Sequence, residues 1–143
     1  MEQELKITIG GEAGQGIETI GYSLLKKLEG LQREAEPLII YGEENPDLLF
    51  LGWESTQGVL QEVVDILNSQ DKRAGLVHPN QVWPLANNLY SLLASAKKVV
   101  AIENNATGQL CRLVAQETGT IIEQKILKYD GWPFTPEYIL ERL

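Results

Sequence analysis

The sequence is poor in the side chains that ligate metals and form cross-links. Its 143 residues include one cysteine, Cys111, and one histidine, His78. A single cysteine cannot form an intramolecular disulfide, and the pair cannot supply the ligands of an iron–sulfur cluster or a structural zinc ion. We therefore expect any redox cofactor to be held elsewhere.

Long apolar runs and basic clusters are also missing. The longest apolar stretches, such as "LLFLGW", are far too short to span a bilayer, and Glu2 and Glu4 stand where a signal peptide would carry basic residues. A formal net charge of −8 repels phosphate backbones. These absences predict a cytoplasmic protein that binds neither nucleic acid nor membranes.

What the chain does have is a regular alternation of apolar patterns. Short β-branched or apolar runs alternate with segments whose apolar residues repeat every three or four positions, as in strands that alternate with helices. Strands are expected at 5–9, 47–53, 74–79, 98–104 and 120–127, and helices at 17–28, 59–67, 84–95, 107–118 and 136–143. This order predicts an α/β fold with a mostly parallel sheet and helices on both faces.

Local signals mark where these elements begin and where the chain divides. Ser55 and Thr56 are expected to cap the helix at 59–67, Pro84 to open the helix at 84–95, and Thr135 to cap the last helix. The apolar stripe is lost from Glu29 to Glu36, and Pro37 ends any continuing helix. We therefore divide the chain into residues 1–34 and 35–143.

A glycine-rich loop follows the first expected strand. Its glycines are Gly10, Gly11, Gly14 and Gly16. Free N–H groups at such a strand-to-helix junction favour an anion, and Gly11, Gly14 and Gly16 are therefore candidate cofactor-binding residues. The spacing, however, fits neither a dinucleotide loop nor a Walker loop, and Glu12 and Glu18 would repel phosphate. A tight turn without a ligand is the favoured interpretation.

Two further candidate sites follow expected strands. Ligands in open α/β sheets bind outside the carboxyl ends of strands, where the chain places several polar residues and glycines. The candidate cofactor-binding residues are Ser55, Thr56, Glu103, Asn104, Gly108 and Gln109. Helix caps, or a surface for a partner, would use the same residue types, so both interpretations stay open.

The remaining reactive and aromatic side chains have mainly structural interpretations. His78 has no nucleophile near it in the sequence, so we expect a loop histidine with its hydrogen bonds satisfied. Cys111 lies among apolar residues and is expected to be a small buried side chain. Trp53, Trp83 and Trp132 are expected at the edge of the core or at subunit contacts.

Four motifs, in this order, resemble one known family. They are "LLFLGWESTQG", "VHPNQVWPLA", "KKVVAIENNATGQLCRLV" and "KYDGWPFTPEYI". Together they resemble the C-terminal domain of the alpha subunit of 2-oxoacid:acceptor (ferredoxin or flavodoxin) oxidoreductases, over about residues 29–143. The resemblance implies a domain of the transketolase C-terminal type. One departure is Glu54, where the family usually has glycine.

The first 28 or so residues resemble another part of the same enzymes. The segment "ITIGGEAGQGIETIGYSLLKKL" is similar to the first strand, glycine loop and helix of a gamma-type domain, which is often fused in front of the alpha chain. In fused chains this beginning and the alpha C-terminal domain are separated by the rest of the gamma domain and by the thiamine-pyrophosphate-associated domain. The sequence therefore resembles an internally shortened version of a longer subunit.

The resemblance implies a role in a complex. The family's full complex oxidatively decarboxylates 2-oxoacids to acyl-coenzyme A, using thiamine pyrophosphate, Mg²⁺, an iron–sulfur cluster and coenzyme A. None of these cofactors is expected in this chain, which would be an interface-forming domain without a catalytic centre. The implied partners are a beta-type subunit and, through the complex, ferredoxin, with homo-oligomers left open. The alternative is a stand-alone nucleotide or coenzyme A binding module that uses Ser55, residues 103–109 and residues 129–131.

Overall fold

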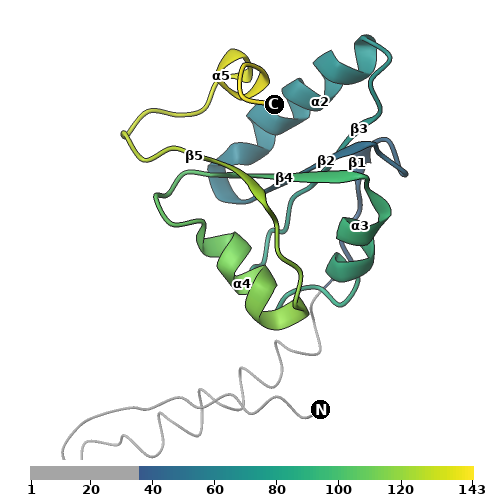
Figure 1. Ribbon diagram of the computed structural model, residues 1–143, viewed down its shortest axis with the longest axis vertical. Coiled ribbons are helices and arrows are strands. Elements are labelled where there is room, and N and C mark those ends of the chain that lie inside the picture. The colour runs from purple at the N-terminus through teal and green to yellow at the C-terminus, as the bar shows by residue number, and fades with distance from the viewer. Residues whose placement is uncertain (1–35) are drawn as a thin grey trace, which may run out of the picture. The chain divides into compact units, whose positions relative to one another are not determined.

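The computed structural model describes residues 36–143, which fold around one five-stranded sheet (Figure 1). The strands are β1 (Tyr41–Gly42), β2 (Leu48–Gly52), β3 (Ala74–Val77), β4 (Lys98–Glu103) and β5 (Gln124–Leu127). Their order in the sheet is β1-β3-β2-β4-β5. The strand expected at 5–9, the helix at 17–28 and the glycine loop between them lie outside the described residues, and the division at residue 34 stays a prediction.

The sheet is parallel except at one edge. Strand β2 lies between β3 and β4 and runs parallel to both, with Phe50 opposite Leu76 and Val100. Strand β5 is parallel to β4, and only the two-residue β1 is antiparallel to its neighbour β3. A central parallel strand needs apolar side chains on both faces, and this explains the continuous apolar run at 48–51. The expected mostly parallel sheet is confirmed.

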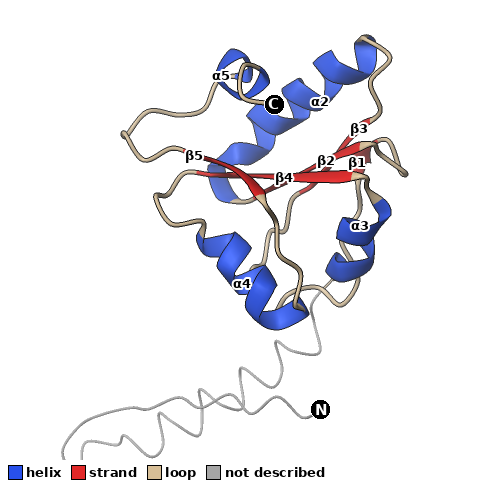
Figure 2. Ribbon diagram, in the orientation of Figure 1, coloured by secondary structure: helices blue, strands red, loops and turns tan. Residues whose placement is uncertain are grey.

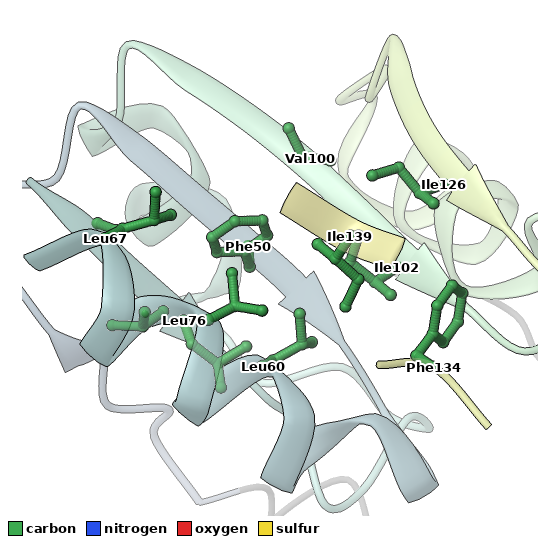
Figure 3. Close-up of a cluster of buried hydrophobic side chains, with 12 residues drawn as sticks. Phe50, Leu60, Leu67, Leu76, Val100, Ile102, Ile126, Phe134 and Ile139 are labelled. Atoms are coloured by element: carbon green, nitrogen blue, oxygen red, sulfur yellow. The ribbon is translucent and has the colours of Figure 1, made fainter. Parts of the chain in front are cut away.

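Helices cover both faces of the sheet, as expected (Figure 2). One face is covered by α2 (Gln57–Ser69) and α5 (Pro136–Leu140), the other by α3 (Leu89–Ser95) and α4 (Gln109–Thr118). Alternate residues of β2 therefore enter different cores. Phe50 packs on the α2 side, with Leu60 and Ile139 from the two helices (Figure 3), whereas Leu49 and Leu51 pack with Leu110 of α4.

The signals for helix starts were right at one position and wrong at two. Thr135 caps α5, because its hydroxyl accepts a hydrogen bond from the Tyr138 N–H at 3.3 Å. The expected capping of α2 by Ser55 or Thr56 is wrong. A short 3-10 turn, Glu54–Thr56, precedes this helix, and the Thr56 hydroxyl points back to donate to the Trp53 carbonyl at 2.9 Å.

The expected opening of a helix at Pro84 is also wrong, since α3 begins only at Leu89. The segment before it is a loop whose last residue, Asn88, bonds to distant backbone. The Asn88 side chain accepts from the Leu38 N–H at 2.9 Å and donates to the Leu38 carbonyl at 2.7 Å. The strand expected at 120–127 is likewise shorter, because only its second half pairs with β4.

Candidate functional site

The carboxyl ends of the parallel strands form the edge where a site is expected. The connection through α2 leads from β2 to β3 on one side, and the connection through α3 then leads back across β2 to β4. The strand order therefore reverses between β2 and β4, which is the position where open α/β sheets bind ligands. Here Ser55 and Asn104 meet, and Asn104 Nδ2 donates to Ser55 Oγ at 2.9 Å.

Glu103, at the end of β4, has a fully buried side chain that is bonded to the start of α4. Its carboxylate accepts from the backbone N–H groups of Leu110 at 2.9 Å and Cys111 at 3.0 Å, and from Asn105 Nδ2 at 2.7 Å. The side-chain oxygen Oδ1 of Asn105 accepts in turn from the backbone N–H groups of residues 107, 108 and 109. Two side chains thus satisfy five consecutive N–H groups.

These hydrogen bonds determine the charge state of Glu103. Burial alone would raise the pKa of the carboxyl, but the hydrogen bonds from Asn105 and from the Leu110 and Cys111 N–H groups outweigh it, so the pKa is lowered. The partial positive charge at a helix N-terminus acts in the same direction. Glu103 is therefore a buried carboxylate at neutral pH.

The other expected site residues have different surroundings. Thr56 is buried and bonded to Trp53, whereas Gln109 is exposed at the first turn of α4. Gly108 precedes α4 with φ +63°, a conformation in which glycine avoids the strain of a side chain. Of the predicted residues, the structure brings Ser55 and Asn104 together at one cavity.

That cavity, of about 510 Å³, is bordered on one side by the loop between β5 and α5. Its size lies within the range of small-molecule sites. It is lined by Ser55, Asn104, Lys128, Tyr129, Gly131, Trp132 and Pro133. The cavity thus combines polar ends of β2 and β4 with the β5–α5 loop, of which residues 129–131 were expected to contribute to the alternative binding module, whereas Lys128, Trp132 and Pro133 were not.

Lys128 organises this loop from inside. Its side chain is 9% exposed, and its ammonium group donates to Asp130 Oδ1 and to the Trp132 carbonyl. Asp130 Oδ1 also accepts from the Trp132 N–H at 3.0 Å. The hydrogen bond from Lys128 lowers the pKa of the Asp130 carboxyl, so the two groups form an ion pair at neutral pH. The spacing of Lys128 and Asp130 in "KYDGW" was the one sequence signal for this arrangement.

A second, smaller cavity of about 220 Å³ lies beyond β2 and β3, where Glu54 and His78 are among its lining residues. Among residues 36–143 neither ring nitrogen of His78 has a hydrogen-bond partner, in contrast to the satisfied histidine expected from the sequence. Burial lowers the pKa of the imidazole. Glu54 itself has φ +53°, a left-handed backbone conformation that glycine adopts without strain, in agreement with the glycine that the resemblance implies at this position.

Cys111 is buried in α4, as expected. Burial, together with the neighbouring Glu103 carboxylate, raises the pKa of the thiol to about 12, so the metal-binding thiolate is strongly disfavoured. Among residues 36–143 there is no group of three or more His, Cys, Asp or Glu side chains that could hold a metal ion. The described residues therefore do not fit an iron–sulfur cluster. Within the same range, no helix has the length and apolar character needed to cross a bilayer.

The fold and its edge define an α/β domain whose parallel sheet carries loop cavities at the carboxyl ends of its strands. No family model matches the chain. It is 32% identical over 114 residues to 2-oxoacid:ferredoxin oxidoreductase 1, subunit alpha, of Aeropyrum pernix, covering 76% of this chain and 18% of that protein. The corresponding subunit of Sulfurisphaera tokodaii is also 32% identical, over 123 residues, with 83% of this chain and 19% of that protein covered.

Solved structures agree with these relatives. The 2-oxoglutarate:ferredoxin oxidoreductase of Magnetococcus marinus superposes with a TM-score of 0.73 and 27% identity, over 92% of this chain and 23% of that chain. The alpha chain of a probable 2-oxoacid ferredoxin oxidoreductase from Thermoplasma acidophilum superposes with a TM-score of 0.52 and is 31% identical in sequence, over 75% of this chain and 93% of that chain. The chain belongs to the family of 2-oxoacid:ferredoxin oxidoreductase alpha subunits. It spans about a fifth of the length of the curated relatives that it matches.

Replacing Glu103 tests its role at the start of α4. We expect Glu103→Ala to lower the free energy of unfolding by about 3 kcal/mol, because two buried N–H groups lose a charged acceptor. Urea denaturation measures this loss, with Glu62→Ala on the exposed face of α2 as the control. The difference should shrink as the pH falls below 4.5, since the stability from a carboxyl with a lowered pKa is lost through its folded-state pKa. Equal stability losses for the two variants would contradict this role.

Replacing Glu54 tests the strain at the end of β2. Because its backbone is in the left-handed region, we expect Glu54→Gly to raise the free energy of unfolding by about 1 kcal/mol. Glu62→Gly, inside α2, should instead lower it by about 1 kcal/mol. Chemical denaturation of both variants separates the effects, and a destabilised Glu54→Gly chain would show that this conformation carries no strain.

The half-buried imidazole of His78 predicts a pH dependence of stability. As the pH falls below 6.5, the unfolded chain takes up a proton on His78 that the folded chain resists, so stability declines until the lower folded-state pKa is reached. We expect this part of the decline to be absent in His78→Gln. Melting temperatures from about pH 5 to about pH 8 test it. Parallel curves for the two proteins would exclude a contribution from His78.

Proposed function

We propose that this chain is an interface-forming domain of a 2-oxoacid:ferredoxin oxidoreductase and has no catalytic centre of its own. The similarity to alpha subunits supports this role, because it extends over most of the described fold yet reaches only about a fifth of the relatives' length. The observation that carries the proposal is that the charged groups at the carboxyl edge are bonded within the domain. The oxygens of Glu103 are bonded to the domain itself, and Asp130 is paired with Lys128.

The reaction and its cofactors belong, in this proposal, to the full complex. That complex would oxidatively decarboxylate a 2-oxoacid to an acyl-coenzyme A, and other domains or subunits would bind thiamine pyrophosphate, Mg²⁺, the iron–sulfur cluster and coenzyme A. The Magnetococcus marinus enzyme was solved with 2-oxoglutarate, coenzyme A and succinyl-CoA bound, and this chain covers only 23% of it. The direct partner would be a beta-type subunit, with ferredoxin as the electron acceptor of the complex.

A second candidate function is a stand-alone module that binds a nucleotide or coenzyme A. The cavity at the reversal of strand order favours it, because Ser55, Asn104, Tyr129 and Gly131 line one space of about 510 Å³. In this alternative the polar residues would orient the ligand, and the aromatic loop would provide a surface for stacking. The participation of Gly11, Gly14 and Gly16 stays a prediction.

The two candidates differ in simple measurements on the purified full chain. An interface domain should bind the beta-type subunit encoded in the same genome, should not reduce a viologen dye with pyruvate or 2-oxoglutarate, and should keep its melting temperature when coenzyme A or ATP is added. A complete oxidoreductase of the family serves as the positive control for dye reduction. Dye reduction by the chain alone would exclude the first function, and a saturable rise in melting temperature would favour the second.

A further inference from the structure

The loop between β5 and α5 presents two large aromatic side chains to solvent. Trp132 is 75% exposed and Tyr129 is 77% exposed, although both residues line the larger cavity. The other exposed residues of the loop are Gly131 and Pro133, which are uncharged, and Asp130, whose charge is paired with that of Lys128. The loop therefore offers a mainly apolar, aromatic surface.

This surface is held rigidly by groups that point inward. The ammonium group of Lys128 joins Asp130 and the Trp132 carbonyl, and it lies 5.6 Å from the centre of the Tyr138 ring in α5. On the other side, the Lys128 N–H donates to the Glu103 carbonyl at 3.1 Å, so the loop begins directly on the end of β4. A loop fixed in this way loses little conformational freedom on binding, which increases the affinity that its exposed side chains provide.

The charge balance indicates what kind of group the surface fits. Among residues 36–143, Lys128 is the one charged residue in the lining of the larger cavity, and Asp130 neutralises it. A polyphosphate ligand would therefore meet no surplus positive charge, and the chain as a whole has a net charge of −8. Exposed tryptophan and tyrosine on a rigid support are instead typical of the anchor residues of protein interfaces.

We infer that Tyr129 and Trp132 are the anchors through which this domain docks on an uncharged, apolar segment of the beta-type subunit. This inference rests on the proposed function and adds the surface and the chemistry of the contact. The aromatic rings would pack on apolar or proline side chains of the partner. Ser55, which accepts a hydrogen bond from Asn104, keeps its hydroxyl proton to donate to a carbonyl at the edge of the contact.

The test compares three variants of the full chain for binding to the purified beta-type subunit. We expect Trp132→Ala to raise Kd by about 30-fold and Tyr129→Ala by about tenfold, since interface anchors carry most of the binding energy. Tyr90→Ala is the matched control, because Tyr90 is 59% exposed on α3 and does not line the cavity. It should leave Kd unchanged within about threefold. Because all three side chains are largely exposed, melting temperatures should equal that of the unaltered chain.

A second readout follows Trp132 directly. The difference in acrylamide quenching of tryptophan fluorescence between the unaltered chain and Trp132→Phe reports on the Trp132 indole. We expect this indole to be accessible to acrylamide in the free chain and shielded when the beta-type subunit is added. Binding with equal affinity by all variants would overturn the inference and leave the proposed function intact. Failure of the unaltered chain to bind would overturn both. If the Trp132 indole is already shielded in the free chain, the loop has another occupant and the inference is overturned. The same conclusion follows if saturating coenzyme A shields the indole.

Discussion

The buried carboxylate of Glu103 is the group on which the carboxyl edge of this domain depends. A charge that is fully removed from water needs donors on every side, and Glu103 finds two of them in the first turn of α4. The end of β4 and the start of α4 are therefore fixed together. Because Leu110 and Val114 of α4 belong to the same core cluster as Leu51, this carboxylate helps to position one of the two helices on that face of the sheet.

The same strand end also supports the neighbouring loop. The Glu103 carbonyl accepts from the Lys128 N–H, and the buried Lys128 side chain then pairs with Asp130 and the Trp132 carbonyl. Polar groups along this edge are thus bonded inward, whereas Tyr129 and Trp132 face solvent. This separation of satisfied polar groups from exposed aromatic rings is typical of a surface built for contact.

Much of the fold could be predicted because it follows from side-chain periodicity. The apolar run of β2 and the Thr135 cap each act over a few residues, and both were predicted correctly. The start of α3 was not, because Asn88 bonds to Leu38, fifty positions away, and no local pattern carries that information. The candidate site shows the same contrast between local signals, which the sequence reveals, and long-range contacts, which it does not. Sequence placed Ser55 and Asn104 at strand ends, but their meeting depends on the reversed strand order.

Three titratable side chains at this edge, Glu103, Asp130 and Cys111, have pKa values shifted away from neutral pH. General acids and bases act best with a pKa near the working pH. The hydrogen bonds around Glu103 and Asp130 lower the pKa of each carboxyl, whereas burial raises the pKa of Cys111 to about 12. Each shift moves the group further from titration at neutral pH. A carboxylate kept charged and a thiol kept neutral are good hydrogen-bonding and packing groups but poor proton carriers, so these three side chains serve mainly to hold the strand ends, the start of α4 and the β5–α5 loop in place.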